Sequence, residues 1–446
     1  MPTMPSVPGP ASESFELREP ARMHRGAYPL SMASASDPGS TAAPFQLRSL
    51  IGPVYLPNFL YSMGAGLVLP ITPLFAKELG ASVGAISLIV TFGAIGGISA
   101  NVPAGVLSDR YGVRATMSAG LAATALSALA IGATRGVGLL AVLLFVTAAA
   151  QAIFNVARLA YVARVVPISQ RGRAISMVGG TARLGMFLGP ALGGGLGQTF
   201  GLHAAFYAQA LVTGVASVLL LTLTRSATLA PAPPIRGSSA YGRMARILVG
   251  HRREFLTVGA VAFAIVVMRQ GRQLLMPLWG DHIGLDVARI GLVLSLGSAL
   301  DATLFYPVGL IMDRYGRKFA VVPSLVLLAA SLVLMPLATT FPTFLVLGLL
   351  SGFGNGFGSG VVMTLGADLA PLEGAGEFIG VWRLVADFGS AAAPLGVGAL
   401  AEVATLATSA VATGLVGVVG VLIMLFLVEE TLHRPAPSEP SRARAP

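Results

Sequence analysis

The sequence contains no cysteine among its 446 residues, and this absence rules out several kinds of chemistry. Disulfides, thiol catalysis and cysteine-bound metals are all excluded. The five histidines are scattered without metal-ligand spacing, so no metal site is predicted. No nucleophile pattern, carboxylate pair or phosphate-binding loop is present, since the glycines at 193–195 lie in an apolar run that follows no strand. We therefore expect neither an enzyme nor a bound cofactor, and without a nucleotide-binding domain we expect no use of ATP.

Charged residues are also scarce, at 11% of the chain against 54% hydrophobic residues, with a mean hydropathy of +0.79. A soluble protein of this length needs far more polar surface. Uncharged runs such as Ala115–Thr134 approach the roughly 20 residues that a helix needs to cross a bilayer, and they lack the polar alternation of barrel strands. The net charge of +10 is not arranged as basic runs interleaved with aromatic residues, so no nucleic-acid partner is expected. The composition predicts an all-α protein solvated by the lipid bilayer.

Apolar runs between charged or Gly/Pro breaks predict twelve membrane spans. They lie near 51–76, 83–107, 115–134, 137–163, 172–197, 203–224, 255–280, 288–312, 319–338, 342–369, 377–402 and 405–428. Lys and Arg outside these spans or at their edges gather on the side of the two termini, whereas the other side carries only Lys77, Arg135 and Arg289. The positive-inside rule therefore places both termini in the cytoplasm, in a multi-pass protein of the plasma membrane. The predicted divisions are a disordered cytoplasmic tail (1–47), a six-helix bundle (48–224), a cytoplasmic linker (225–254), a second six-helix bundle (255–429) and a cytoplasmic tail (430–446).

One loop pattern occurs twice. Gly-Val-Leu-Ser-Asp-Arg-Tyr-Gly at 105–112 recurs as Gly-Leu-Ile-Met-Asp-Arg-Tyr-Gly at 309–316, 204 residues later, and each copy closes the second span of its half. A parallel repeat predicts two related bundles with the substrate site between them at mid-membrane. The pattern resembles the cytoplasmic loop signature of the major facilitator superfamily, and the resemblance extends from about residue 48 to about residue 430. It implies the major facilitator fold, with 12 transmembrane helices in two pseudo-symmetric six-helix bundles.

The resemblance also implies a cytoplasmic gate at these loops. It places Asp109 beside the start of the eleventh span and Asp313 beside the start of the fifth, with glycines that let the helix ends approach closely. The alternative is a pair of ordinary turns rich in basic residues. The expected gate residues are Gly105, Asp109, Arg110, Gly112 and Arg114 in the first copy, and Gly309, Asp313, Arg314, Gly316, Arg317 and Lys318 in the second.

A second motif lies in the fifth span and consists of Gly185, Gly189, Pro190, Gly193 and Gly194. It resembles the antiporter signature of the drug:proton branch of the same superfamily. Glycines four residues apart share a helix face and admit a neighbouring backbone, while the proline frees a carbonyl group and bends the helix. The alternative is an ordinary seam of small residues. The family's arginine at the start of the fourth span has no counterpart here, so a proton mechanism that uses it is not carried over.

Away from the span edges, five arginines and two aspartates fall inside the predicted spans, where each charge costs about 3 kcal/mol to insert and should face a cavity or a partner. A proton-driven carrier needs a carboxylate that gains and loses a proton as access alternates. Asp387 is the first candidate, with Arg383 four residues earlier to modulate it, and Asp301 is the second. The alternative for Asp387 is a permanent ion pair.

Polar and aromatic residues within the spans are the candidates for a substrate cavity. For Arg269 and Arg272 the alternative is that they extend to the outer surface, and for the aromatic residues it is packing. The candidates are Asn58, Tyr61, Gln151, Asn155, Arg158, Arg183, Arg269, Arg272, Gln273, Asn355 and Trp382.

Two functions fit these residues. The first is proton-coupled efflux of a small amphipathic drug or metabolite by alternating access, because the fifth-span motif resembles that of antiporters. The second is transport of an anionic metabolite, because five arginines against two aspartates leave a shared cavity positively charged. A non-transporting receptor is a third class, which no feature of the sequence requires. The expected partners are a small-molecule substrate, protons and the lipid bilayer, and the protein is expected to act as a monomer.

Overall fold

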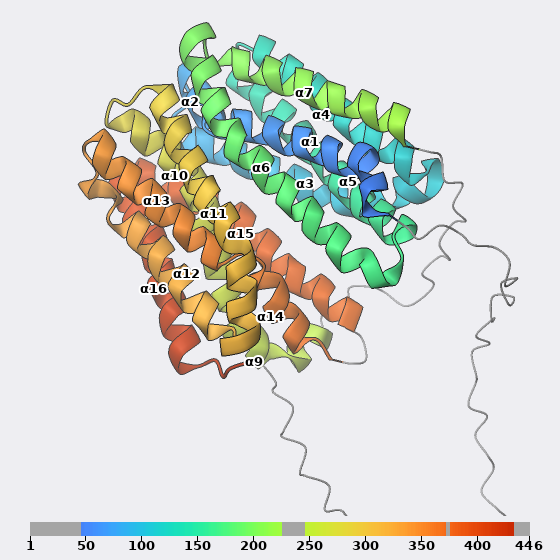
Figure 1. The fold of residues 1–446 in the computed structure, drawn as a ribbon. Helices are drawn as coiled ribbons and strands as arrows, with labels where there is room; N and C mark the ends of the chain where they lie inside the picture. The colour runs from blue at the N-terminus through green and yellow to red at the C-terminus, as the bar shows by residue number, and fades with distance from the viewer. Residues whose placement is uncertain (1–45, 225–245, 372–374, 432–446) are drawn as a thin grey trace, which may run out of the picture. The chain divides into compact units, whose positions relative to one another are not determined.

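The computed structural model describes residues 46–224, 246–371 and 375–431, which form helices joined by short loops (Figure 1). Most of the predicted tails and linker lies outside these residues, at 1–45, 225–245 and 432–446. Within the described part of the chain the fold is all-α, as the composition predicts.

The first half forms six helical rods. The first rod consists of two short helical turns, η1 (Leu47–Leu50) and η2 (Ile51–Tyr55), followed by α1 (Leu56–Val68) and α2 (Ile71–Glu78), and the other five are α3 (Val83–Tyr111), α4 (Val113–Ala133), α5 (Val137–Val165), α6 (Ile168–Phe200) and α7 (His203–Leu223). The first rod bends by 40° between α1 and α2. Pro70 lies at the bend. Because proline has no amide hydrogen, it interrupts the helical hydrogen-bond ladder at this point.

The second half also forms six rods. These are α9 (Arg252–Glu254), η3 (Phe255–Gly259) and α10 (Ala260–His282) in one rod, then α11 (Val287–Tyr315), α12 (Lys318–Val333) with the turn η4 (Met335–Leu337), α13 (Phe341–Phe357) with α14 (Val361–Leu369), α15 (Ala375–Val403) and α16 (Leu406–Phe426). The predicted span 342–369 is divided between α13 and α14. Gly360 lies at this break with φ +77°, a left-handed conformation that glycine adopts without a steric penalty.

The two halves are related by the same 204-residue offset as the loop motif. Helix α3 runs from Val83 to Tyr111 and α11 from Val287 to Tyr315, and the α1–α2 rod matches α10 in the same way. The packing repeats as well. In the first half, α1 packs on α6 and α7, α3 packs on α5, and α4 packs on α5 and α7. In the second half, α10 packs on α15 and α16, α11 packs on α13, and α12 packs on α13 and α16. The fold therefore contains two pseudo-symmetric bundles, which meet along α6–α11 and α3–α15.

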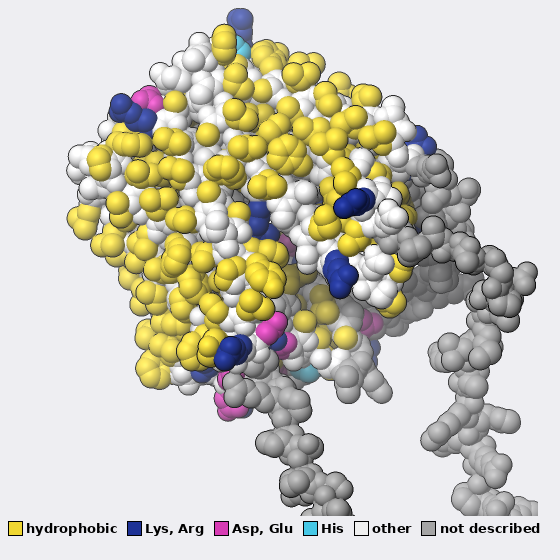
Figure 2. All heavy atoms as spheres, viewed as in Figure 1, with side chains coloured by type: hydrophobic (Ala, Val, Ile, Leu, Met, Phe, Trp, Pro, Cys, Tyr) yellow, Lys and Arg dark blue, Asp and Glu magenta, His cyan; other side chains and the backbone are white. Residues whose placement is uncertain are grey.

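The outer faces of the rods are apolar. Val102, Leu211 and Phe426 are among many large apolar side chains that are exposed, and Figure 2 shows such side chains covering most of one face. By length and hydropathy, nine helices of the described residues can cross a membrane, and the bent α1–α2 rod makes a tenth. The other two rods are α6, which is rich in glycine and arginine, and α12, which has 16 residues. The chain is therefore a multi-pass membrane protein whose outer surface suits lipid.

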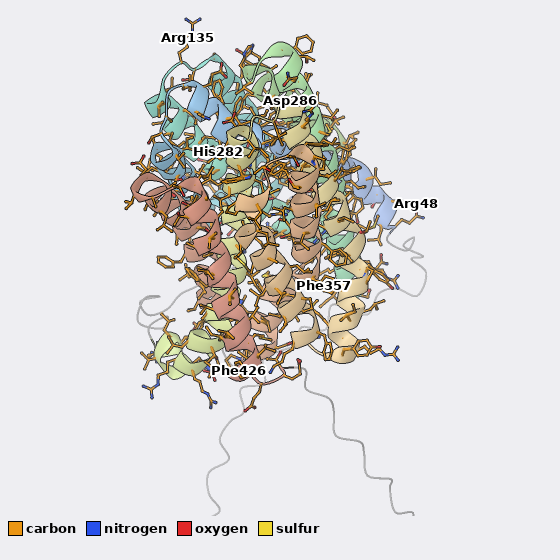
Figure 3. All side chains as sticks on the ribbon, turned by 90° about the vertical axis from the view of Figure 1, so that its left-hand side faces the viewer. Arg48, Arg135, His282, Asp286, Phe357 and Phe426 are labelled. Carbon is orange, nitrogen blue, oxygen red and sulfur yellow. The ribbon has the colours of Figure 1, made fainter. Side chains whose placement is uncertain are left out.

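The loop motifs follow α3 and α11 and lie at one end of the bundles, which we call the motif end. The other end, where α2 and α10 finish and α3 and α11 begin, is the opposite end. Figure 3 shows Arg135, in the loop between α4 and α5, projecting at the opposite end and Phe426, at the end of α16, near the motif end.

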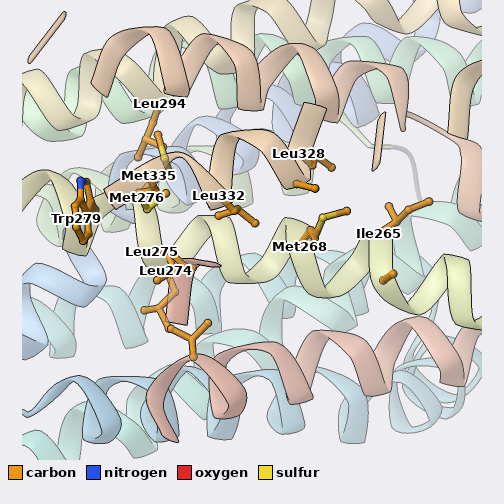
Figure 4. Close-up of a cluster of buried hydrophobic side chains, with 14 of the residues drawn as sticks. Ile265, Met268, Leu274, Leu275, Met276, Trp279, Leu294, Leu328, Leu332 and Met335 are labelled. Carbon is orange, nitrogen blue, oxygen red and sulfur yellow. The ribbon is translucent and has the colours of Figure 1, made fainter. Parts of the chain in front are cut away.

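Buried apolar residues hold α10 inside the second bundle. Met268, Met276 and Trp279 of α10 lie in one core with Leu328 and Leu332 of α12 (Figure 4). The indole Nε1 of Trp279 also donates a hydrogen bond to the Ala338 carbonyl oxygen at 2.9 Å. This packing fixes the helix that carries Arg269 and Arg272 towards the centre of the molecule.

Candidate functional site

The fifth-span motif lies in α6, and one of its faces packs directly on the backbone of α1. A Cβ atom on Gly185 would stand 2.6 Å from the Met63 amide nitrogen, and one on Gly189 would stand 2.6 Å from the Met63 carbonyl oxygen. A Cβ on Gly193 would be closer still to the Leu67 carbonyl oxygen. Only glycine allows helices to approach this closely, so the close approach that the spacing predicts is present.

The other face of the same motif contacts the second half of the molecule. The backbone N–H of Ala191 donates to the Ser295 hydroxyl of α11 at 2.8 Å, one residue after the proline inside the helix. A Cβ on Gly194 would stand 2.6 Å from the Val287 carbonyl oxygen. Under the 204-residue offset Ser295 corresponds to Thr91, whose hydroxyl donates to the Ala391 carbonyl oxygen of α15 at 3.4 Å. The motif is thus more than a seam within one bundle, because it joins the two halves.

Polar contacts close the opposite end. Lys77 of α2 forms an ion pair with Asp281 of α10. The Glu402 carboxylate of α15 accepts hydrogen bonds from the Ser82 hydroxyl and from the Gly84 amide, at 3.2 Å for the amide, where α3 begins. A carboxylate at a helix N-terminus satisfies free amide donors and complements the helix dipole. Each of these contacts links the two halves.

At the motif end the aspartates pair within their own halves. Asp109 bonds to Arg164 at the end of α5, at 2.8 Å, and Asp313 bonds to Arg317 at 3.2 Å. Within the described residues neither aspartate forms an ion pair with the start of α15 or α6, and the placement implied by the resemblance stays a prediction. The contacts that join the halves lie at the opposite end and at the centre. A Cβ on Gly105 or Gly309 would meet no atom within 4 Å.

The remaining gate residues have local roles in this conformation. Gly112 and Gly316 have φ of +83° and +112°, which explains the glycine at each turn. Arg110 and Arg314 stack on the tyrosine that follows each of them, and Arg114 donates to the Leu221 carbonyl oxygen. Lys318 donates its backbone N–H to Glu430 at 3.1 Å.

Three arginines converge at the centre, and we call this group with Asp301 the arginine cluster. Arg183 of α6 forms an ion pair with Asp301 of α11 at 3.9 Å and donates to Ser359 at 3.2 Å. Ser359 in turn donates to Asp301 at 2.9 Å. The Arg183 guanidinium also lies over the Phe305 ring, 3.8 Å from its centroid. The cluster therefore connects α6 of one half with α11 and the α13–α14 break of the other.

Arg269 and Arg272 bring surplus positive charge to the cluster. Arg269 donates to the Asn355 carbonyl oxygen at 3.2 Å and Arg272 to the Ser351 hydroxyl at 3.0 Å. Both also interact electrostatically with Asp301. The Nε atoms of Arg183, Arg269 and Arg272 are buried and make no hydrogen bond within the described residues. Three cations around one carboxylate leave unused donors and excess charge, which is suited to an incoming anionic or acceptor group.

A second polar cluster lies within the first half. Arg158 of α5 donates to the Asn58 side chain, which itself donates to the Val178 carbonyl oxygen at 2.8 Å and to Thr181 at 2.9 Å. Asn155 donates to the Tyr61 hydroxyl at 3.1 Å. Asn58, Tyr61, Asn155 and Arg158 are thus brought together as a hydrogen-bonded group in which Arg158 has neutral partners.

Three predicted residues of α15 lie differently from expectation. Trp382 is only 2% exposed, packs on Gly366 and donates to the Val362 carbonyl oxygen at 2.8 Å, so it is a packing residue and not part of an open cavity. The expected ion pair between Arg383 and Asp387 is not formed within 4.0 Å, although the two lie one turn apart. Asp387 makes no ion pair with any described residue and is half-buried, which argues against a permanent pair in this conformation.

Sequence reasoning missed several neutral residues of the site. Ser351, Ser359 and Phe305 contact the arginines, and Ser295 accepts a hydrogen bond from the backbone next to Pro190. Hydropathy gives them no signal, because serine and phenylalanine are common in membrane helices. The repeat offers one clue, since the 204-residue offset pairs Ser295 with Thr91 at the same type of inter-half contact.

Comparison with known proteins agrees with these features. The family model of the Major Facilitator Superfamily matches residues 54–268 and, a second time, residues 261–446. The chain is 22% identical over 351 residues to an uncharacterized MFS-type transporter of Methanocaldococcus jannaschii, covering 78% of this chain and 90% of that protein. It is 24% identical over 266 residues to Multidrug resistance protein 1 of Bacillus subtilis, covering 58% of this chain and 65% of that protein.

Solved structures share the fold at low sequence identity. A POT family transporter in complex with a thioalcohol-conjugated peptide has a TM-score of 0.71 and 13% identity, covering 85% of this chain and 95% of that one. A bacterial homologue of the human lysosomal transporter Spinster has a TM-score of 0.70 and 14% identity, covering 86% of this chain and 97% of that one. Since the family model matches both halves and the fold agrees, this chain belongs to the Major Facilitator Superfamily and is a transporter, not an enzyme.

Proposed function

We propose that this transporter exports a small amphipathic drug or metabolite in exchange for protons, by alternating access across the plasma membrane, with its termini and motif end in the cytoplasm. The observation that carries the proposal is the position of the two mid-span carboxylates. Asp301 lies on the α6–α11 crossing and Asp387 on α15, which crosses α3. A proton that binds at either crossing changes the charge where the halves meet.

The two carboxylates have different parts in this mechanism. Asp387 has no ion-pair partner among the described residues, so it can take up a proton without breaking a contact. Protonation of Asp301 would remove its attraction to Arg183 while the Ser359 hydroxyl still offers a hydrogen bond. Asp387 is therefore the first candidate for the transported proton, and Asp301 couples protonation to the contact between halves.

Two further observations support export by exchange. The α6 motif, which resembles that of drug:proton antiporters, contacts both α1 and α11, so movement of this part of α6 acts on both halves. Relatives at low identity include Multidrug resistance proteins 1 and 2 of Bacillus subtilis. The positive-inside distribution of Lys and Arg supports the proposed orientation.

The test is a proton-flux assay with purified protein in liposomes that contain a pH-sensitive dye. Cationic dyes, neutral drugs and organic anions are added in turn. Replacement of Asp387 by Asn should abolish substrate-driven proton movement while substrate still binds, whereas Glu78→Gln, which removes an exposed carboxylate at the end of α2, should leave proton movement unchanged. If no substrate moves protons at any pH, exchange with protons is wrong.

Transport of an anionic metabolite is the second candidate, and the arginine cluster favours it. Arg183, Arg269 and Arg272 surround a single carboxylate and retain unused donors. In that case Arg269→Gln and Arg272→Gln should weaken the binding of organic anions and spare cationic dyes. Inhibition by organic anions without any proton flux would select this candidate over the first.

A further inference from the structure

A groove of about 350 Å³ lies on the second bundle where α12 ends and α13 begins, and we call it the outer groove. Both helices pack on helices of their own half, and Figure 1 shows them on the side of the molecule away from the first half. The wall consists of the end of α12, the turn η4 and the first two turns of α13. The outer groove is therefore separate from two hollows between the halves, of about 240 and 160 Å³, which contain Gln151 and Gln273 respectively.

The wall of the outer groove is apolar. None of its lining side chains is charged, and its one hydroxyl, that of Thr343, already donates to the Thr340 carbonyl oxygen at 2.9 Å. At the rim Leu337 is 71% exposed and Val346 is 62% exposed. Apolar surface of this kind costs about 25 cal/mol per Å² in water. In a multi-pass membrane protein it faces the acyl chains of lipids instead, and they are the occupants that its chemistry fits.

Helix α12 is too short to cross the whole hydrocarbon layer, and the outer groove lies where it stops. Its 16 residues extend about 24 Å at 1.5 Å per residue, whereas the hydrocarbon core of a bilayer is about 30 Å thick. The helix begins at Lys318 at the motif end, gives way to η4 at Met335, and is followed by α13 from Phe341. The groove thus lies at a depth where α12 has ended and hydrocarbon continues. An acyl chain can fill the space that the missing helical turns leave.

A charged pair lies beside the outer groove at the opposite end of the bundles, where Figure 3 shows Asp286. The Arg289 guanidinium lies over the Phe341 ring, 5.6 Å from its centroid, and Phe341 directly precedes Pro342 of the groove wall. Arg289 is 57% exposed and forms an ion pair with Asp286 at 3.2 Å, but its guanidinium makes no hydrogen bond within the described residues. Its donors suit a phosphate group, which arginine binds with charge-assisted hydrogen bonds.

We infer that the outer groove binds one acyl chain of a membrane phospholipid whose phosphate group lies at Arg289. The bound chain packs beside Ala338, whose carbonyl oxygen accepts the indole N–H of Trp279 at 2.9 Å. Asp281, which joins the halves through its ion pair with Lys77, lies two residues beyond Trp279 on α10. The lipid thus supports the closed opposite end from outside the bundle. This site goes beyond the proposed export function and does not depend on exchange with protons.

Tryptophan fluorescence tests the inference, because the sequence contains only two tryptophans, Trp279 and Trp382. The Trp382→Phe variant leaves Trp279 as a reporter beside the outer groove. Phosphatidylcholine with dibrominated acyl chains, added to this variant in detergent, should quench its fluorescence up to a saturating level. Trp382, measured in the Trp279→Phe variant, lies near the motif end and should be quenched only in proportion to the lipid added. Proportional quenching of Trp279 as well would show that the groove meets bulk lipid only, and would overturn the site.

Substitutions in the Trp382→Phe protein locate the lipid. Val346→Phe fills the outer groove and should raise the lipid concentration for half-maximal quenching by about tenfold, as a loss of about 1.4 kcal/mol would. Val326→Phe, on an exposed part of α12 outside the groove, is the matched control and should leave it unchanged.

Arg289→Gln tests the position of the phosphate group. It should weaken binding of the brominated phospholipid by about tenfold and leave unchanged the binding of the methyl ester of the same brominated fatty acid, which has no phosphate. Unchanged half-saturation in the Val346→Phe protein would contradict the groove as the site, and ester binding as tight as that of the phospholipid would contradict the role of Arg289. These measurements need no transport, so failure of proton exchange and failure of this site are separate results.

Discussion

At the scale of single residues, the second loop motif contains one strongly held arginine. The Arg317 side chain is only 11% exposed and bonds to Asp368 at 2.8 Å and to the Met312 carbonyl oxygen at 2.8 Å. Hydrogen bonds to the Asp368 carboxylate raise the pKa of the Arg317 guanidinium above its ordinary value, although burial opposes this. Since the pKa is raised in the folded state, the arginine contributes its full stabilisation below its ordinary pKa, provided that Asp368 is ionised, and this contribution is lost as the pH rises through the raised pKa. The Arg317 guanidinium therefore keeps its charge near neutral pH.

Arg317 bonds to two carboxylates, of which Asp368 is mostly buried and Asp313 is exposed, and this contrast gives a stability prediction. Arg317→Gln should lower the free energy of unfolding by about 2 kcal/mol, because it breaks charged hydrogen bonds and leaves Asp368 half-buried without its partner. Asp313→Asn should cost less than about 1 kcal/mol, because the Asp313 side chain is 79% exposed. Denaturant unfolding in detergent, followed by tryptophan fluorescence, measures both. Equal losses would mean that Asp368 is not the partner that matters.

The sequence identified charged residues of the site but not their pairing. Arg183 and Asp301 could each be named because a charge inside a membrane span is costly. Their meeting could not be predicted, since it depends on how α6 crosses α11. Spacing alone predicted an Arg383–Asp387 pair that is not formed, because residues one turn apart can pair but need not do so.

At the scale of the helix, glycines divide into crowded and uncrowded positions. At the opposite end a Cβ on Gly398 would stand 2.5 Å from the Ser87 hydroxyl oxygen and 3.2 Å from the Gly84 Cα. At the motif end Gly105 and Gly309 have open space around them. The crowded glycines allow the present contact between halves. We propose that the uncrowded ones allow the contact that forms when the motif end closes.

Leucine substitutions should separate these two roles. Gly398→Leu should open the opposite end and raise the reaction rate of a single cysteine at Thr91 by about tenfold, as a population shift of about 1.4 kcal/mol would. Gly105→Leu should leave that rate unchanged and abolish transport, because the motif end can no longer close. Gly138→Leu is the matched control, since this glycine is also uncrowded but lies at the opposite end, away from the other half. Normal transport by Gly105→Leu would refute the role of Gly105 in closure.

The hydropathy pattern predicted the positions of the helices closely, but it did not predict the points at which two of them bend or break. The predicted spans 83–107 and 288–312 match α3 and α11 because charges and turn glycines mark their ends. The bend at Pro70 and the break at Gly360 interrupt runs that remain apolar throughout. Hydropathy cannot distinguish a continuous helix from one that bends, since both bury the same side chains. The break at Gly360 directly follows Ser359, which donates to Asp301 of the arginine cluster.

At the scale of the whole molecule, the structure is one conformation of a carrier, joined at the opposite end. Lys77–Asp281 and the Glu402 contacts link the halves there, whereas Asp109 and Asp313 pair within their halves. Alternating access requires a second conformation in which these contacts separate and the motif end closes. We propose that the loop motifs then pair across the halves, as the family resemblance implies.

Asparagine at either aspartate tests this exchange of contacts. Asp109→Asn and Asp313→Asn should slow turnover by about tenfold, as a loss of about 1.4 kcal/mol at the gate would, with substrate affinity almost unchanged. Transport rates in liposomes and equilibrium binding in detergent give the two quantities. Arg135→Gln, an exposed change at the opposite end, is the control. A large loss of affinity would place these aspartates near the substrate and contradict the gate.

Covalent closure of the opposite end should stop transport reversibly. The double variant K77C/D281C carries the only two thiols of its chain, at a contact between α2 and α10. A short bifunctional thiol reagent with a reducible bond should join them and abolish transport, and a reductant should restore it. Each single variant treated in the same way is the control. Full transport by the joined protein would mean that these helices stay together throughout the cycle.

The surplus charge of the arginine cluster has an electrical consequence. Three guanidinium groups and one carboxylate lie at the centre, so the empty carrier holds net positive charge within the membrane. One elementary charge that moves through the whole membrane potential exchanges about 2.3 kcal/mol per 100 mV. Even a partial displacement of the cluster would thus change the free-energy difference between the two conformations by about as much as one hydrogen bond contributes. Voltage would act as a driving force on the return of the empty carrier, and an anionic ligand that neutralises the cluster would remove it.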